Sequence, residues 1–200
     1  MARWLLNLFE FGAVLAGVTA WKRIQSTYWK WLLFYLVLVL VNELLGKYLN
    51  YIQRSDVNQL LYRYIAPFRF ALLLYVLSRP LPLKFRLQTR WVFLLYLLLF
   101  AAEQFVLPEA YLHSSTLSLL VMYLLILLLS ITYLFQVVQS NAILNFQTDR
   151  HFWLAVGLIL FYVIFMPFHT ARVSLSKYYP DVFIVYWYVQ MLASCLMYVC

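Results

Sequence analysis

The stretch "YRYIAPFRFALLLYVLSRP", residues 62–80, decides the class of fold. As a helix rising 1.5 Å per residue it would span about 28 Å, close to the ~30 Å thickness of bilayer hydrocarbon. Arg69 lies near its middle and Arg63 near its start. Charged side chains inside a membrane are rare and costly, and they pair with one another or face a polar cavity. The stretch therefore predicts a transmembrane helix whose two arginines need partners on neighbouring helices.

The composition of the whole chain agrees with this prediction. Of its 200 residues, 66% are hydrophobic and 11% are charged, far from the composition of a soluble domain. We predict an all-α fold, a polytopic membrane protein with seven transmembrane helices in one bundle, as a single domain over residues 1–200. The predicted spans lie near 4–21, 29–48, 57–79, 90–107, 114–138, 151–170 and 179–199.

The distribution of positive charge predicts the orientation and the partners. Eight Lys and Arg residues fall on one side of the predicted membrane and five on the other, and cytoplasmic loops are enriched in these residues. We therefore predict an outside N-terminus and a cytoplasmic C-terminus. The basic residues lie in short loops beside apolar spans, which favours contacts with anionic lipid and excludes nucleic acid as a partner.

Five charged residues lie inside predicted spans, and a histidine lies at the end of another. On the predicted boundaries, Arg69 lies within about 2 Å of the membrane centre, and the others lie roughly 4–13 Å toward the outer side. These residues are Glu10, Glu43, Arg63, Arg69, Glu103 and His169. Because they meet at similar depths from different helices, we expect them to form one cluster in the outer half of the membrane.

We expect Arg69 to pair with Glu10, and Arg63 with Glu43 or Glu103, since arginine holds a carboxylate through two parallel hydrogen bonds. Asn42 and Gln104 would extend this network. Three interpretations remain open. The pairs could fix only the order of the helices, they could line a polar pocket that opens outward and binds a small polar ligand or an ion, or they could contact a partner membrane protein.

Two prolines lie inside predicted spans, Pro67 between the two arginines and Pro167 just before His169. Proline lacks the backbone donor of a helix interior, so we expect both helices to bend. Two bent helices would open space on the outer side of the bundle.

The sequence contains no motif that predicts catalysis, a metal site or a cofactor. The histidines are widely spaced, and no nucleophile elbow or phosphate-binding glycine loop is present. Residues 179–199 contain no lysine, which excludes a retinal Schiff base in the last helix. The remaining enzymatic alternative is an intramembrane lipid enzyme that uses Glu43 or Glu103 with His169.

Three further stretches, "NELLGKYL" at 42–49, "NQLLYRYIAPFRFALLLYVL" at 58–77 and "DRHFWLAVGLILFYVIF" at 149–165, carry a family resemblance. Together with the polar-led last span, they resemble a poorly characterised family of seven-helix membrane proteins from Gram-negative bacteria. The resemblance implies a bacterial inner membrane. Members often appear beside sensor histidine kinases, which implies a sensory or accessory role. Arg69 departs from the acidic or neutral residue usual in the third span.

These observations lead to three functional hypotheses. The first is a non-enzymatic sensor or accessory protein whose charge cluster recognises a ligand or a partner helix. The second is a structural subunit of a larger membrane protein complex. The third is a small ion-coupled transporter, which predicts charges in both halves of the membrane.

Overall fold

The computed structural model describes residues 2–106, 117–140 and 146–199, without the side chains of residues 2–5 and 172–174. The described residues form helices and no strand. The helices are α1 (Ala2–Thr19), α2 (Trp21–Ile24), α3 (Lys30–Tyr51), α4 (Ser55–Ser78), α5 (Leu83–Val106), α7 (Leu117–Gln139), α8 (Arg150–Tyr178) and α9 (Pro180–Val199). This confirms the predicted all-α class.

Six of these helices, α3, α4, α5, α7, α8 and α9, are long and apolar enough to cross a membrane. The chain is therefore a multi-pass membrane protein. The predicted first span, 4–21, corresponds to α1, whose described apolar part, Leu6–Thr19, is shorter than the other six. Residues 107 and 114–116 of the predicted spans lie outside the described residues.

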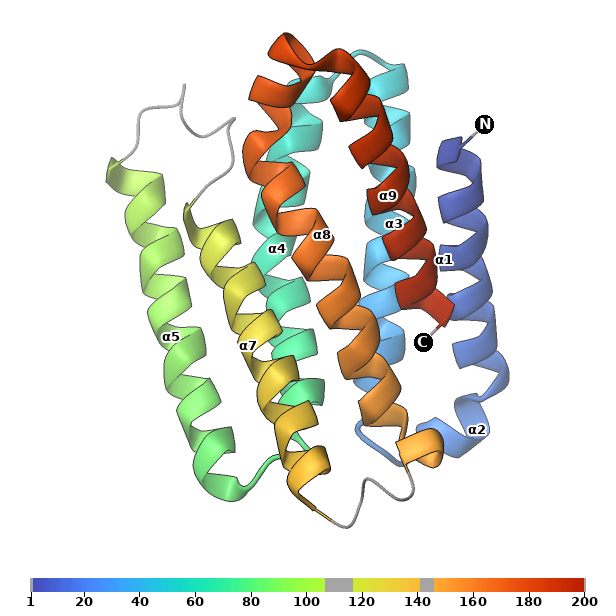
Figure 1. Ribbon diagram of the computed structural model, residues 1–200, viewed down its shortest axis with the longest axis vertical. Coiled ribbons are helices and arrows are strands. Elements are labelled where there is room, and N and C mark those ends of the chain that lie inside the picture. Colours follow the sequence, from blue (N-terminus) through green and yellow to red (C-terminus); the bar gives the residue numbers. More distant parts are fainter. Residues whose placement is uncertain (1, 107–116, 141–145, 200) are drawn as a thin grey trace.

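Six helices form a closed ring: α1, α3, α4, α7, α8 and α9. Each of them packs against two neighbours in the ring. Contacts join α3 to α4, α4 to α7, α7 to α8, α8 to α9, α9 to α1, and α1 back to α3. Figure 1 shows the long helices running in alternating directions, with α5 at one edge of the bundle. Helix α5 lies outside the ring and packs on α4 and α7. The ring depends on α1, which links α9 to α3.

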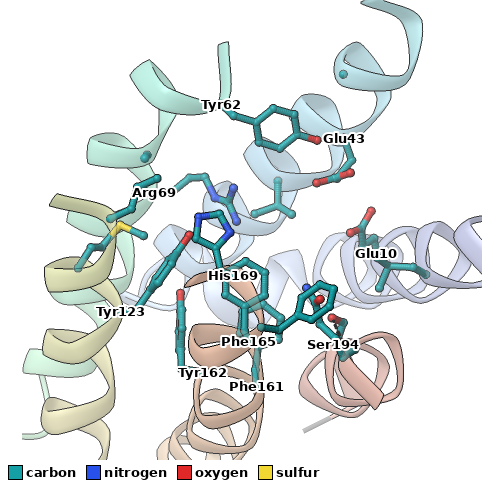
Figure 2. A pocket seen from close by; sticks show the side chains of 18 of the residues that line it. Glu10, Glu43, Tyr62, Arg69, Tyr123, Phe161, Tyr162, Phe165, His169 and Ser194 are labelled. Carbon is teal, nitrogen blue, oxygen red and sulfur yellow. Dashed lines mark hydrogen bonds between the residues drawn. The ribbon is translucent and has the colours of Figure 1, made fainter. Parts of the chain in front are cut away.

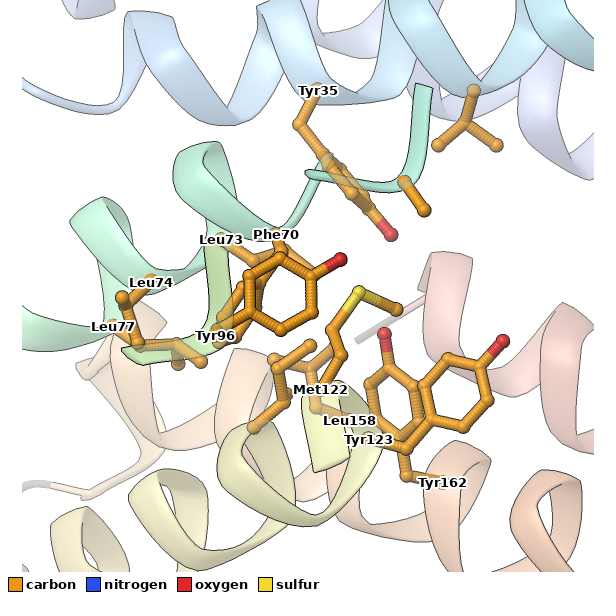
Figure 3. Close-up of a cluster of buried hydrophobic side chains, with 13 residues drawn as sticks. Tyr35, Phe70, Leu73, Leu74, Leu77, Tyr96, Met122, Tyr123, Leu158 and Tyr162 are labelled. Atoms are coloured by element: carbon orange, nitrogen blue, oxygen red, sulfur yellow. The ribbon is translucent and has the colours of Figure 1, made fainter. Parts of the chain in front are cut away.

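The apolar core fills one half of the ring. Phe70 and Leu73 of α4 pack there with Tyr96 of α5, Ile126 of α7 and Leu158 of α8, and each is at most 1% exposed. Figure 3 shows Phe70 and Tyr96 in contact, and their ring centres lie 4.7 Å apart with edge-to-face geometry. This geometry is favourable for aromatic pairs. The core joins α5 to the ring on the side where α4 ends.

The joint between α4 and α5 is shorter than the sequence suggests. The predicted span starts at residue 90, whereas α5 begins at Leu83, directly after Pro82. Proline favours the first turn of a helix, where its missing donor costs nothing. Arg86 closes the joint, donating from Nε to the Leu81 carbonyl at 2.9 Å and from Nη2 to the Arg79 carbonyl at 2.5 Å. Most of the basic joint is therefore the first part of α5.

Both internal prolines lie within continuous helices, Pro67 in α4 and Pro167 in α8. After Pro167, the Thr170 hydroxyl donates to the carbonyls of Met166 at 3.1 Å and Pro167 at 3.0 Å. Such bonds from a threonine to the preceding turn often accompany a bent helix. The bends at the two prolines stay predictions.

Candidate binding cavity

A cavity of about 600 Å³ lies inside the six-helix ring. Its wall includes Asn50 and Gln59, which are exposed at the end of the bundle where α3 connects to α4, so the cavity reaches the surface there. Its volume is within the ~300–1,000 Å³ usual for small-molecule sites. Five of the six predicted cluster residues line it: Glu10, Glu43, Arg63, Arg69 and His169.

Arg69 projects from the middle of α4 into the cavity (Figure 2). Its guanidinium carbon lies 6.0 Å from the centre of the Tyr35 ring, and it also donates a hydrogen bond to the Tyr35 hydroxyl. Tyr123 and Tyr162 lie beside it on α7 and α8. In the described part of the chain, no ion pair joins Arg69 to Glu10, its expected partner. Phenol groups take the place of the predicted carboxylate.

Two carboxylates form a different wall of the cavity. Glu10 of α1 is 3% exposed, and its Oε1 accepts a hydrogen bond from the Tyr198 hydroxyl of α9 at 3.3 Å. Its other oxygen, Oε2, has no hydrogen-bond partner among the described residues. Glu43 of α3 lies next to Glu10 and accepts from the Tyr62 hydroxyl (Figure 2). Two neighbouring carboxylates repel each other, so this wall attracts a cationic or donor group.

Close packing of α3 on α4 places Tyr62 against Glu43. A Cβ atom built on Gly46 would lie 2.8 Å from Asn58 Oδ1 and 2.9 Å from both the Tyr62 hydroxyl and its ring. Atoms essentially never approach a Cβ so closely. Glycine is therefore the residue that lets the Tyr62 ring lie flat on α3, one turn after Glu43.

Arg63 and Glu103 make contacts other than the predicted ion pairs. With the Gln104 amide oxygen turned toward the guanidinium, it accepts from Arg63 Nη2 at 2.7 Å and Nε at 2.8 Å, which joins α4 to α5. Glu103 is 5% exposed and accepts from Ser118 N at 2.9 Å and Ser118 Oγ at 2.5 Å. It thus caps the start of α7, whose first N–H groups lack partners within the helix. No ion pair joins Arg63 to Glu43 or Glu103 in the described ranges.

Aromatic rings cover the side of the cavity formed by α8. Phe161 stacks on Phe165 with ring centres 5.0 Å apart, and Phe165 stacks on His169 at 5.4 Å. Tyr123 of α7 meets both Phe165 and His169 edge-on. The cavity therefore combines a guanidinium, two carboxylates and a broad apolar surface.

The sequence reasoning missed the tyrosines and amides of this cavity. The predicted cluster consists of charged residues and a histidine, so it does not include the tyrosines that line the cavity: Tyr35, Tyr62, Tyr123, Tyr162 and Tyr198. Their positions carried a usable signal, since a tyrosine in the middle of a span needs a partner for its hydroxyl. Asn42, expected to extend the network, is buried, and neither of its side-chain polar atoms has a partner among the described residues.

A second polar group, the Tyr28–His151 cluster, lies at the other end of the bundle and consists of Tyr28, Tyr133, Asp149 and His151. The Tyr28 hydroxyl lies 2.6 Å from His151 Nε2, and Asp149 Oδ1 accepts from the His151 backbone N–H at 2.9 Å. The Tyr133 hydroxyl donates to Asp149 Oδ2. Burial raises the pKa of the Tyr28 phenol above its usual value. The cluster ties the segment before α3 to the end of α7 and the start of α8.

The described residues contain no group of three His, Cys, Asp or Glu side chains that could hold a metal ion. No family model matches the chain, and comparisons with curated proteins and with solved structures found no match. The arguments about function therefore rest on the geometry of the cavity.

Proposed function

We propose that this protein is a non-enzymatic sensor or accessory protein of a bacterial inner membrane that binds a small polar ligand. The observation that carries the proposal is the charged cavity inside the ring, with Arg69 on one wall and Glu10 and Glu43 on another. Ionisable residues at membrane depth are costly and mark binding sites or ion pathways. Groups that only fixed the order of the helices would be expected to pair directly, and the described residues contain no ion pair among these three.

A packed apolar section supports a cavity that opens at one end. Along α4, Leu74, Val76 and Leu77 lie between Leu73, which still lines the cavity, and the end of the helix, and each is at most 6% exposed. Along α8, Ala155 and Leu158 lie between the cavity and the Tyr28–His151 cluster, and each is at most 1% exposed. The transporter hypothesis predicts charges in both halves of the membrane, and such charges would interrupt this section, which supports a binding protein.

The proposed orientation places the N-terminus outside and the C-terminus in the cytoplasm, with seven spans including α1. The cavity then opens to the outer side. A ligand that favours one packing of α4 and α8 over another would shift the population of these helices around Pro67 and Pro167. A membrane protein partner in the cytoplasmic half would detect this shift, while the apolar surface of the ring faces lipid.

Native mass spectrometry of the protein, extracted gently from its own membrane, tests the proposal. We expect the chain to carry a bound small molecule, and Arg69→Gln to reduce the bound fraction by about ten-fold. Arg90→Gln is the matched control, because Arg90 is exposed on α5 and does not line the cavity. A chain that retains only a protein partner, in both forms, would instead support the structural subunit of a larger complex.

A further inference from the structure

Three buried side-chain oxygens of the cavity wall have no hydrogen-bond partner among the described residues. Glu10 Oε2, Asn58 Oδ1 and Gln190 Oε1 come from α1, α4 and α9, and all three residues line the cavity. Buried polar atoms in proteins are almost always satisfied, so each exception needs an explanation such as a ligand or water. Because all three are oxygens, the missing groups are donors.

The wall that contains Arg69 needs an acceptor group instead of a donor group. A guanidinium has five N–H donors and no acceptor, and in the described residues Arg69 makes no ion pair. The groups beside it are phenol hydroxyls and not carboxylates, so the guanidinium lacks the bidentate acceptor that it binds best. An anionic group of a ligand would supply this acceptor through two parallel hydrogen bonds.

The α7 and α8 side of the cavity is apolar. Met122 and Ile126 of α7 and the stacked rings of Phe161 and Phe165 on α8 line it. A ligand held by the charged walls would also lie against this surface. An apolar part of the ligand would fit there.

We infer that the ligand is a small zwitterion, with an oxyanion group bound by Arg69, an ammonium group bound by Glu10 and Glu43, and an apolar part that lies against the rings of α8. This inference rests on the proposed function and deepens it. A zwitterion adds no net charge to a site that already contains charges of both signs, Glu10 and Glu43 with Lys47, Arg63 and Arg69. A simple anion or cation would satisfy one wall and leave the other unsatisfied.

Two sources offer this chemistry, a free amino acid and the ethanolamine phosphate headgroup of a lipid. The test uses the full chain in nanodiscs of phosphatidylglycerol, a lipid without an ammonium group, with binding measured by isothermal titration calorimetry. The probes are L-tryptophan, tryptamine, which lacks the carboxylate, and indole-3-propionate, which lacks the ammonium group. Glycerophosphoethanolamine represents the lipid headgroup.

We expect L-tryptophan or glycerophosphoethanolamine to bind at least about ten-fold more tightly than either single-charge analogue, because each analogue leaves one wall without its charged partner. The tighter of the two zwitterions identifies the source. A single-charge analogue that binds as tightly as the better of the two zwitterions, or no binding of any probe, would overturn the inference. If no probe binds while native mass spectrometry still finds a bound small molecule, the zwitterion is wrong and the proposed function stands.

Two variants test which wall binds which charged group of the ligand. Arg69→Gln should abolish the preference for tryptophan over tryptamine, and Glu10→Gln the preference for tryptophan over indole-3-propionate. A residue that only supports the fold would weaken all probes by the same factor. If Arg69→Gln does not fold, comparing the probes on the unmodified chain and on Glu10→Gln still tests whether the ligand is a zwitterion.

Discussion

Replacing Glu103 with alanine should destabilise the bundle without changing ligand binding. The carboxylate accepts two hydrogen bonds from Ser118, at 2.9 Å from its backbone N and 2.5 Å from its Oγ. Ser118 is 0% exposed, so water cannot replace the lost acceptor. Hydrogen bonds to a charged group contribute ~1.5–3 kcal/mol each, and a buried donor left without a partner is costly. We expect Glu103→Ala to lower the free energy of unfolding by about 3 kcal/mol.

The measurement is unfolding in mixed micelles with increasing sodium dodecyl sulfate, followed by far-ultraviolet circular dichroism. Glu103→Gln keeps one acceptor oxygen and should lose only about half as much, since charged hydrogen bonds are roughly twice as strong as neutral ones. Ser118→Ala removes the hydroxyl bond alone and should cost about 1 kcal/mol. The double variant Glu103→Ala with Ser118→Ala measures the coupling between the two side chains.

Two results would contradict this account of Glu103. One is a loss below about 1 kcal/mol for Glu103→Ala, which is less than a single charged hydrogen bond. The other is a Ser118→Ala cost that is the same with and without Glu103, because additive effects indicate no direct contact. An altered affinity for the ligand in Glu103→Ala would show that this residue also acts on the cavity, which it does not line.

Three further predictions use the same unfolding measurement. Gly46→Ala should cost ~1–3 kcal/mol and weaken ligand binding, because its Cβ displaces the α4 side chains beside it. Gly12→Ala is the control, with nothing within 4 Å of the added Cβ, and should be neutral or stabilising. Tyr28→Phe should cost about 1 kcal/mol by removing the 2.6 Å contact with its histidine partner, and an unchanged midpoint would contradict the cluster. Phe70→Ala should cost ~3–5 kcal/mol, whereas Phe105→Ala, 90% exposed, should cost little.

The helical membrane fold was predictable because its signal is repeated along the chain. Apolar stretches of membrane length recur between short polar joints. The boundaries were less predictable at basic joints. Leu83 starts a helix that the charges of Lys84 and Arg86 had suggested was a loop, because long basic side chains at a helix end can reach water or backbone carbonyls while the backbone stays helical.

The location of the candidate site could be predicted from the sequence, but the contacts between its side chains could not. The matching depths of Glu10, Glu43 and Arg69 indicated one cluster, and the structure brings these residues to one cavity. Which side chains they contact depends on the rotation of each helix about its axis. A helix with apolar residues on all sides gives no sequence signal for that rotation. That rotation sends Glu103 to the start of α7 and turns Tyr35 toward Arg69.

The packed apolar section along α4 and α8 has an electrical consequence. A cavity that reaches the surface admits water and ions, whereas the section from Leu74 to Leu77 is packed and buried. The transmembrane voltage then falls mainly across this short section instead of across the full bilayer. One elementary charge moved through the whole voltage changes in energy by about 2.3 kcal/mol per 100 mV. Arg69 lines the cavity five residues before Leu74, so a displacement of about one helical turn toward this section would move its charge into the concentrated field and make the protein responsive to membrane potential.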